Sequence, residues 1–122
     1  MKIRIQRNSV RFRLSKTEVE KLCSEGYIEE TTSFGDTSFK YAVKRYGTTG
    51  ELMATFGNGC ITMLVPEKLL INWPENSVIG FDAKMPITGN ETLSLLLEKD
   101  FKCIDNTAED QSDHYDNPKQ IC

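Results

Sequence analysis

The chain has 122 residues, of which 39% are hydrophobic and 27% charged, a composition typical of one soluble globular domain. Its formal net charge of −3 argues against a general nucleic-acid-binding protein, which would carry a positive charge. No apolar run is long enough to cross a bilayer, and the N-terminal cations are not followed by the uninterrupted apolar segment of a signal peptide. The sequence therefore predicts a cytoplasmic protein that does not associate with membranes.

The first fourteen residues predict a β-hairpin. Residues 2–6 and 10–14 both alternate polar and apolar side chains, which is the pattern of a half-buried strand. A two-residue loop at Asn8-Ser9 closes the hairpin most simply. That loop predicts a register in which Arg4 lies directly opposite Arg13.

The hairpin carries a candidate anion-binding site on one face. Because like charges that oppose each other across a sheet destabilise it, we expect an anion nearby. That anion is a ligand phosphate, a nucleic-acid backbone or the carboxylates of the protein itself. The alternative is that the long side chains extend into water and cover an exposed sheet face. The candidate ligand-binding residues are Lys2, Arg4, Arg11 and Arg13.

A capping box predicts a helix over residues 15–25. Ser15 is the N-cap, Glu18 stands three residues later, and Gly26 follows at the position where a left-handed residue ends a helix. Cys23 falls on the apolar stripe of this helix, so we interpret it as a core residue rather than a nucleophile.

Extended segments and glycine-rich turns fill most of the remaining chain. Proline at position 66 predicts a short helix over residues 66–72, which Trp73-Pro74 ends. Residues 91–99 are compatible with a helix, but Gly89-Asn90 favours a hairpin and a strand. The predicted strands cover residues 27–34, 39–44, 52–56, 60–65, 78–84 and 92–98.

These elements predict an α+β fold: a curved antiparallel sheet or an incomplete β-barrel of about eight strands, with the 15–25 helix over one opening. No repeat period is visible. We expect residues 1–104 to form one globular domain and residues 105–122 to form an acidic C-terminal tail.

The two ends of the chain have opposite charges. Residues 1–14 carry five cations and no acids, whereas the tail carries five acids and one cation, Lys119. A tail lying over the cationic face of the hairpin would supply the expected anions, in weak and salt-sensitive pairs. The alternative is a disordered terminus. The tail acids are Asp105, Glu109, Asp110, Asp113 and Asp116.

No motif for catalysis or for a cofactor is present. The four cysteines include no CxxC pair, and without an export signal we expect free thiols. A zinc site from Cys103, His114 and Cys122 with an aspartate has spacings that match no standard pattern. The sequence therefore predicts no cofactor and does not identify a metal site.

Three segments resemble a group of small bacterial proteins of unknown function. They are the opening Lys-Ile-Arg-Ile-Gln followed by Asn8-Ser9, the segment Glu-Lys-Asp-Phe-Lys-Cys at residues 98–103, and the acidic stretch before Asn117-Pro118. The resemblance covers nearly the whole chain. It implies a bacterial cytoplasmic protein with no established activity.

The leading hypothesis is a non-catalytic domain that binds a partner protein or a small anionic ligand at the cationic face of the hairpin. The alternative is an enzyme that acts on a phosphorylated small molecule, with the same cations as a clamp and tail acids as metal ligands.

Overall fold

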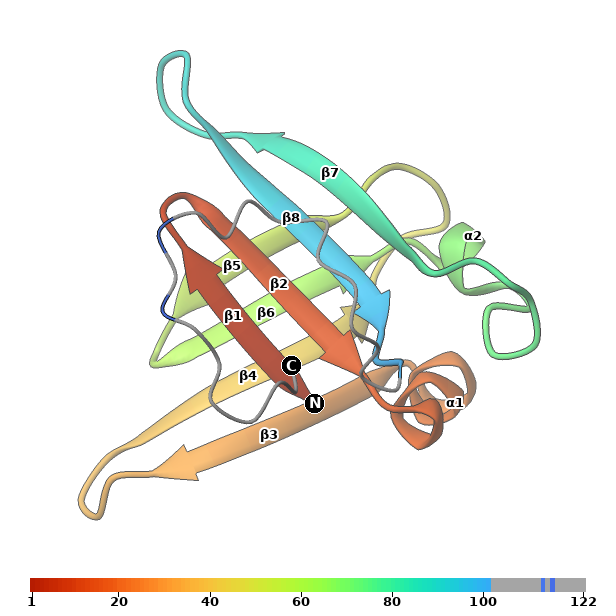
Figure 1. Ribbon diagram of the computed structural model, residues 1–122, viewed down its shortest axis with the longest axis horizontal. Coiled ribbons are helices and arrows are strands. Elements are labelled where there is room, and N and C mark those ends of the chain that lie inside the picture. Colours follow the sequence, from red (N-terminus) through yellow and green to blue (C-terminus); the bar gives the residue numbers. More distant parts are fainter. Residues whose placement is uncertain (102–112, 114, 116–122) are drawn as a thin grey trace.

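The computed structural model describes residues 1–101, 113 and 115, and this part of the chain forms eight strands and two helices (Figure 1). The strands are β1 (Lys2–Gln6), β2 (Ser9–Leu14), β3 (Tyr27–Ser33), β4 (Ser38–Arg45), β5 (Met53–Gly57), β6 (Cys60–Val65), β7 (Gly80–Pro86) and β8 (Thr92–Lys99). The helices are α1 (Lys16–Glu25) and α2 (Glu67–Leu70).

The strands form two stacked four-stranded sheets (Figure 1). Sheet A has the order β1-β2-β8-β7 and sheet B the order β3-β4-β6-β5. Both helices lie at the same end of the stack. The predicted α+β class and incomplete barrel are confirmed, with one detail that the sequence did not reveal: the central pair of each sheet, β2–β8 and β4–β6, is parallel.

Helix α1 forms as the capping box predicts. The Ser15 hydroxyl accepts a hydrogen bond from the Glu18 backbone, and the Glu18 carboxylate accepts one from the Ser15 backbone. Gly26 ends the helix with φ 79°, and its N–H donates to the Leu22 carbonyl at 2.8 Å. The helix packs its buried side chains Val19 and Leu22 against the sheets.

Helix α2 is shorter than predicted. Pro66 is its N-cap, and the helix ends at Leu70 because Ile71 is extended and Asn72 has φ 60°. The Trp73 ring is then fully buried, with its indole N–H donating to the Val78 carbonyl at 2.9 Å. Residues 92–99 form a strand, as preferred from the sequence.

The hydrophobic core lies between the two sheets and is covered at one end by α1 and α2. Alternate residues of each central strand point into it, as the period-two pattern requires. Its largest fully buried side chains are Trp73, Phe12, Leu14, Leu22, Leu52, Met63, Leu95, Leu97, Val43 and Val65.

The chain consists of two halves with the same order of elements, although the sequence shows no repeat. Each half is a ββαββ unit, β1-β2-α1-β3-β4 and then β5-β6-α2-β7-β8. The first hairpin recurs 51 residues later, from Lys2 to Met53, with the same register between its strands. The later strands recur after 53 and 54 residues, from Tyr27 to Gly80 and from Ser38 to Thr92.

Pairing between the halves follows the same pseudo-twofold relation. Ser9 pairs with Ser94 in sheet A, and the equivalent residues Cys60 and Lys40 pair in sheet B. An equivalent backbone hydrogen bond lies at the end of each parallel strand pair. The Asp100 N–H donates to the Leu14 carbonyl at 2.8 Å in sheet A, and the Tyr46 N–H donates to the Val65 carbonyl at 2.9 Å in sheet B. Each sheet thus contains one hairpin from either half, and every position of sheet A has an equivalent in sheet B.

Candidate functional site

The first hairpin has a different turn from the one predicted. Its loop is Arg7-Asn8, with Arg7 at φ 51°, so Gln6 pairs with Ser9 and Arg4 lies opposite Arg11. The predicted Arg4–Arg13 pairing is therefore wrong. Two hydrogen bonds at 2.6 Å accompany this turn, from the Ser9 hydroxyl to the Gln6 carbonyl and from the Asn8 amide to the Thr92 carbonyl of β8. Because the error in register is two residues, the cations stay on the predicted face.

The four candidate cations lie together on the outer face of sheet A. With Ile3 they line a shallow depression of about 310 Å³, and this set of cations is called the cationic face below. The register sets Lys2 opposite Arg13 and Arg4 opposite Arg11, so like charges do oppose each other across the two strands. The cationic face consists of Lys2, Arg4, Arg11 and Arg13.

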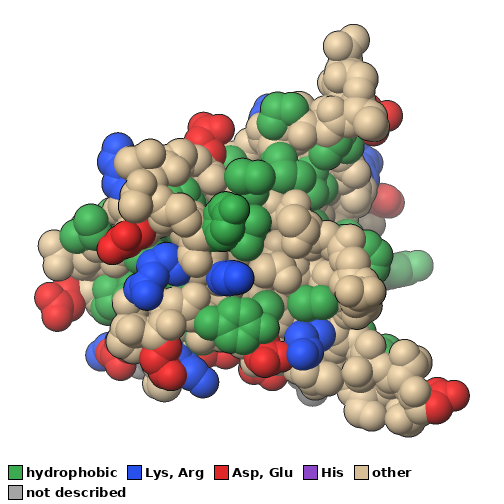
Figure 2. All heavy atoms as spheres, turned by 180° about the vertical axis from the view of Figure 1, so that it is seen from behind, with side chains coloured by type: hydrophobic (Ala, Val, Ile, Leu, Met, Phe, Trp, Pro, Cys, Tyr) green, Lys and Arg blue, Asp and Glu red, His purple; other side chains and the backbone are tan. Residues whose placement is uncertain are grey.

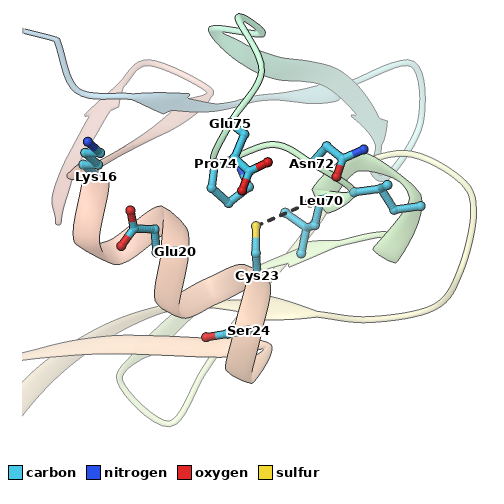
Figure 3. Close-up of a pocket in the computed structure, with 9 residues that line it drawn as sticks. Lys16, Glu20, Cys23, Ser24, Leu70, Asn72, Pro74 and Glu75 are labelled. Carbon is cyan, nitrogen blue, oxygen red and sulfur yellow. Dashed lines mark hydrogen bonds between the residues drawn. The ribbon is translucent and has the colours of Figure 1, made fainter.

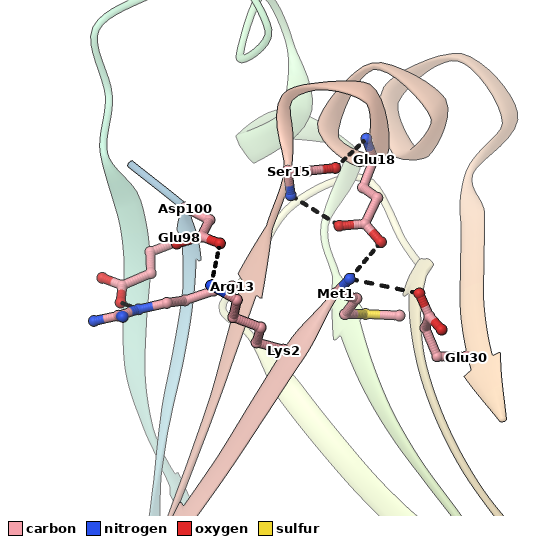
Figure 4. A network of polar contacts seen from close by, with 8 residues as sticks. All are labelled: Met1, Lys2, Arg13, Ser15, Glu18, Glu30, Glu98 and Asp100. Carbon is pink, nitrogen blue, oxygen red and sulfur yellow. Dashed lines mark hydrogen bonds and ion pairs between the residues drawn. The ribbon is translucent and has the colours of Figure 1, made fainter. Parts of the chain in front are cut away.

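Two carboxylates from the end of β8 neutralise part of the cationic face (Figure 4). Glu98 Oε1 lies 2.8 Å from Arg13 Nε and 3.6 Å from Arg11 Nε. Asp100 Oδ2 lies 2.9 Å from Lys2 Nζ. The protein thus supplies some of the expected anions itself. The predicted contact with the tail lies outside the described residues.

A second depression, of about 400 Å³, adjoins the cationic face on the same side of sheet A. Arg11 lines both depressions, so they share a border. Leu96 forms an apolar part of its floor, and Asp82 and Lys84 of β7 stand at the far side. The outer face of sheet A therefore carries two depressions that meet at Arg11, and its charge changes from cationic at β1 to mixed at β7.

The equivalent positions in sheet B carry no cations. Lys2, Arg4, Arg11 and Arg13 correspond to Met53, Thr55, Thr62 and Leu64. Figure 2 views this side and shows hydrophobic side chains gathered there among separate charges. Lys40 pairs with Glu29 at 3.0 Å, and this contact raises the pKa of Lys40. Sheet B demonstrates that the same backbone forms without a cationic face.

A polar cluster at the chain start was missed from the sequence. The amino group of Met1 lies 2.6 Å from Glu18 Oε2 and 3.5 Å from Glu30 Oε1 (Figure 4). Burial favours a raised pKa for Glu18, but hydrogen bonds from the Met1 ammonium and from Ser15 outweigh it, and the pKa is lowered. The equivalents of Met1, Glu18 and Glu30 in the other half are Leu52, Leu69 and Ala83, so this cluster is also unique to one half.

A third hollow, of about 760 Å³, lies between α1 and the segment after α2 (Figure 3). Lys16, Glu20 and Glu75 at its wall carry mixed charges. The Cys23 thiol donates a hydrogen bond to the Leu70 carbonyl at 3.4 Å, and burial raises its pKa despite nearby cations. A thiol held in its protonated form is a poor nucleophile, so the hollow offers no evident chemistry.

Within residues 1–101 together with 113 and 115, no three His, Cys, Asp or Glu side chains gather as metal ligands would. Cys103, His114 and Cys122, considered above for zinc, lie outside the described residues, as do all the tail acids except Asp113. No helix in the described part of the chain has the length and apolar character needed to cross a membrane.

Sequence reasoning found the four cations but not the carboxylates beside them. Glu98 and Asp100 reach the hairpin only because β8 pairs with β2, and that pairing joins residues 85 positions apart, such as Arg13 and Glu98. The local pattern predicted β8 as a strand but did not identify its neighbour in the sheet. Alternate acids at the end of β8 were the only clue that it met a basic strand.

Comparison with known proteins adds a family but no activity. Neither the curated proteins nor the solved structures contain a significant match to this sequence. A family model described as a family of unknown function (DUF7009) matches residues 1–119. Because the match covers nearly the whole chain, the protein belongs to the DUF7009 family of unknown function.

Proposed function

We propose that this protein is a non-catalytic module that binds an anionic ligand or partner at the cationic face of sheet A. The observation that supports this proposal is the difference between the two sheets. At equivalent positions, the directly opposed pair is Arg4–Arg11 in sheet A and Thr55–Thr62 in sheet B.

The arginine pair is not required by the fold. Opposed like charges destabilise a sheet, whereas a cross-strand threonine pair contributes about 0.2–1 kcal/mol of stability. Sheet B forms the same hairpin with the threonine pair. Clustered arginines that oppose each other are therefore better explained by an anion that they bind than by the stability of the sheet.

The chemistry of these side chains supports one class of ligand. Guanidinium groups bind carboxylate and phosphate groups through two parallel hydrogen bonds. The face has four cations, and the carboxylates of Glu98 and Asp100 lie beside them. A ligand with at least two negative charges, presented from phosphate or carboxylate groups, complements it.

The test is a titration of the full chain, followed by NMR, with pyrophosphate and with a hexaglutamate peptide at low ionic strength. The double variant R4T/R11T installs the residues of sheet B. We expect it to weaken binding at least tenfold, because charge-assisted hydrogen bonds contribute about 1.5–3 kcal/mol each.

The matched control is K40T/K44T, which removes two cations from the outer face of sheet B and changes the net charge equally. We expect its affinity to stay within about threefold of the wild type, because its charges lie on the opposite sheet. Equal losses in the two variants would show that binding follows net charge alone. Unchanged binding by R4T/R11T would also overturn the proposal.

A further inference from the structure

We infer that the acidic segment 102–122 of this chain binds the outer face of sheet A and competes there with an external anion. The inference rests on the proposed function, because it concerns the regulation of the same face. Three observations carry it: where the described chain ends, the charge of the segment that follows, and the two depressions of sheet A.

The chain leaves sheet A beside the cationic face. The Asp100 N–H donates to the Leu14 carbonyl at 2.8 Å, and the Asp100 carboxylate pairs with Lys2. Phe101, which follows, is 60% exposed. The remaining 21 residues start at the border of this face and span up to about 70 Å when extended. A six-residue strand such as β2 is only about 20 Å long, so the segment has ample length to cross the sheet.

The charges of the segment and of the face are complementary. The segment has five acids and two lysines, whereas the cationic face has four cations, with Glu98 and Asp100 beside them. An ion pair between Asp100 and Lys2 joins the end of the described chain to the cationic face. The acids of the segment add further negative charge beyond Asp100.

The two depressions of sheet A also suit a peptide with both acidic and apolar side chains. Beyond Arg11, the floor of the second depression contains Leu96 and the hydroxyl groups of Ser9 and Ser94, and Lys84 stands at its far side. The segment combines its acids with apolar residues at positions 104, 115 and 121. Sheet B has no cations at the four equivalent positions and no attached acidic segment at its equivalent end, where Tyr46 stands in the place of Asp100.

A tethered competitor lowers the apparent affinity of the face. A connection within one chain gives an effective local concentration of roughly millimolar order, so a weakly binding segment still occupies its site. Contacts between exposed charges are screened by salt, so this competition weakens at high ionic strength. An external ligand must displace the segment before it binds.

The experiment uses the full chain with the five acids of the segment neutralised, D105N/E109Q/D110N/D113N/D116N. We expect its affinity for pyrophosphate to rise at least tenfold at low ionic strength, with a smaller rise in 0.5 M salt. Adding R4T/R11T to this variant is expected to abolish the rise.

The control neutralises five exposed acids outside the segment, E20Q/E25Q/E51Q/E67Q/E75Q, for the same change in net charge. We expect its affinity to change less than threefold. An equal rise in the control would overturn the inference, as would an unchanged affinity in the segment variant. If R4T/R11T still weakens binding in either case, the proposed function survives without the inference.

A direct measurement complements the titration. A spin label on Cys122, with the other three cysteines replaced by alanine, is expected to broaden the amide signals of β1 and β2 more than those of β5 and β6. The difference is expected to decrease in 0.5 M salt. Equal broadening of the two hairpins, or none in either, would contradict the inference.

Discussion

Sheet A and sheet B have the same backbone and different outer surfaces. Equivalent inward positions carry side chains of similar character, such as Phe12 and Met63 or Leu14 and Val65, all fully buried. Equivalent outward positions differ sharply, with Arg13 in sheet A and Leu64 in sheet B. The inner faces therefore specify the fold, and the outer faces are free to carry different functions.

The two sheets also differ in the distance between neighbouring strands at one position. Gly80 of sheet A corresponds to Tyr27 of sheet B, and each begins its strand. A Cβ atom at Gly80 would lie 2.4 Å from the Leu97 carbonyl and 2.7 Å from the Glu98 Cβ. Strand β7 therefore approaches β8 more closely beside Glu98 than a side chain would allow.

The largest expected effect is that of G80A. The added methyl group meets backbone atoms, so β7 must move away from β8, and we expect a loss of about 3 kcal/mol in the free energy of unfolding. Urea denaturation measures it. The control is G57A, where a Cβ meets nothing within 4 Å, with an expected change below about 1 kcal/mol. Similar losses in both variants would show that the close approach at Gly80 has no special cost.

The second-largest effect is expected for E18Q, which removes the negative charge of Glu18. The equivalent residue in the other half is Leu69, which is uncharged. We expect a loss of about 2 kcal/mol at pH 7, because the carboxylate accepts charge-assisted hydrogen bonds from Met1 and Ser15. Since the folded-state pKa of Glu18 is lowered, its contribution is fully present above the ordinary glutamate pKa of about 4.3 and disappears as the pH falls through the folded-state value.

Unfolding curves of wild type and E18Q are therefore expected to differ at pH 7 and to converge progressively as the pH falls below the ordinary glutamate pKa of about 4.3. A difference that is the same at pH 7 and at pH 3 would contradict the assignment of the stabilisation to the ionised Glu18 carboxylate.

The third effect is that of E98Q, which leaves Arg11 and Arg13 without their shared carboxylate. We expect a loss of about 1 kcal/mol at low salt, reduced by phosphate, which substitutes for the missing anion. The equivalent residue in sheet B is Lys44, and K44Q is expected to change stability by less than about 0.5 kcal/mol. Thermal unfolding with and without phosphate measures both, and an equal phosphate response in the two variants would count against a binding role.

The smallest effect is that of R4T/R11T on stability. Replacing opposed arginines by a threonine pair is expected to leave the free energy of unfolding unchanged or to raise it by up to about 1 kcal/mol at low salt. Urea denaturation is the measurement. A loss greater than about 2 kcal/mol would show that the arginines support the fold and would remove the main argument for binding.

Local patterns predicted the elements well. The capping box at Ser15 and Glu18, Gly26 after the helix and the alternation in 92–98 each reflect interactions between near neighbours in sequence. The turn at Arg7-Asn8 was misplaced because Asn8 bonds to Thr92 of β8, which no local rule includes. The repeat escaped notice because the two halves share apolar character at most inner positions, such as Ile3 and Ala54, rather than residue identity.

The candidate site was predicted in part for the same reason. Its cations lie in one hairpin and follow from alternation alone. Its carboxylates, Glu98 and Asp100, arrive through a parallel pairing with a strand from the other end of the chain, and the Met1 cluster depends on contacts with α1 and β3. Non-local pairing of this kind is decided by the packing of the whole core.

The exchange of hairpins between the halves bears on the order of folding. Sheet B consists of the continuous segment 27–65, so all its strands are synthesised before β7 and β8. Sheet A joins both ends of the segment 2–99 and closes a much longer loop, as the Ser9–Ser94 pairing shows. During synthesis the arginine-rich hairpin β1–β2 therefore lacks its neighbouring strand until β8 has been made, and part of its inner face stays uncovered until then. An anion bound to that hairpin during this interval would act on folding as well as on the finished protein.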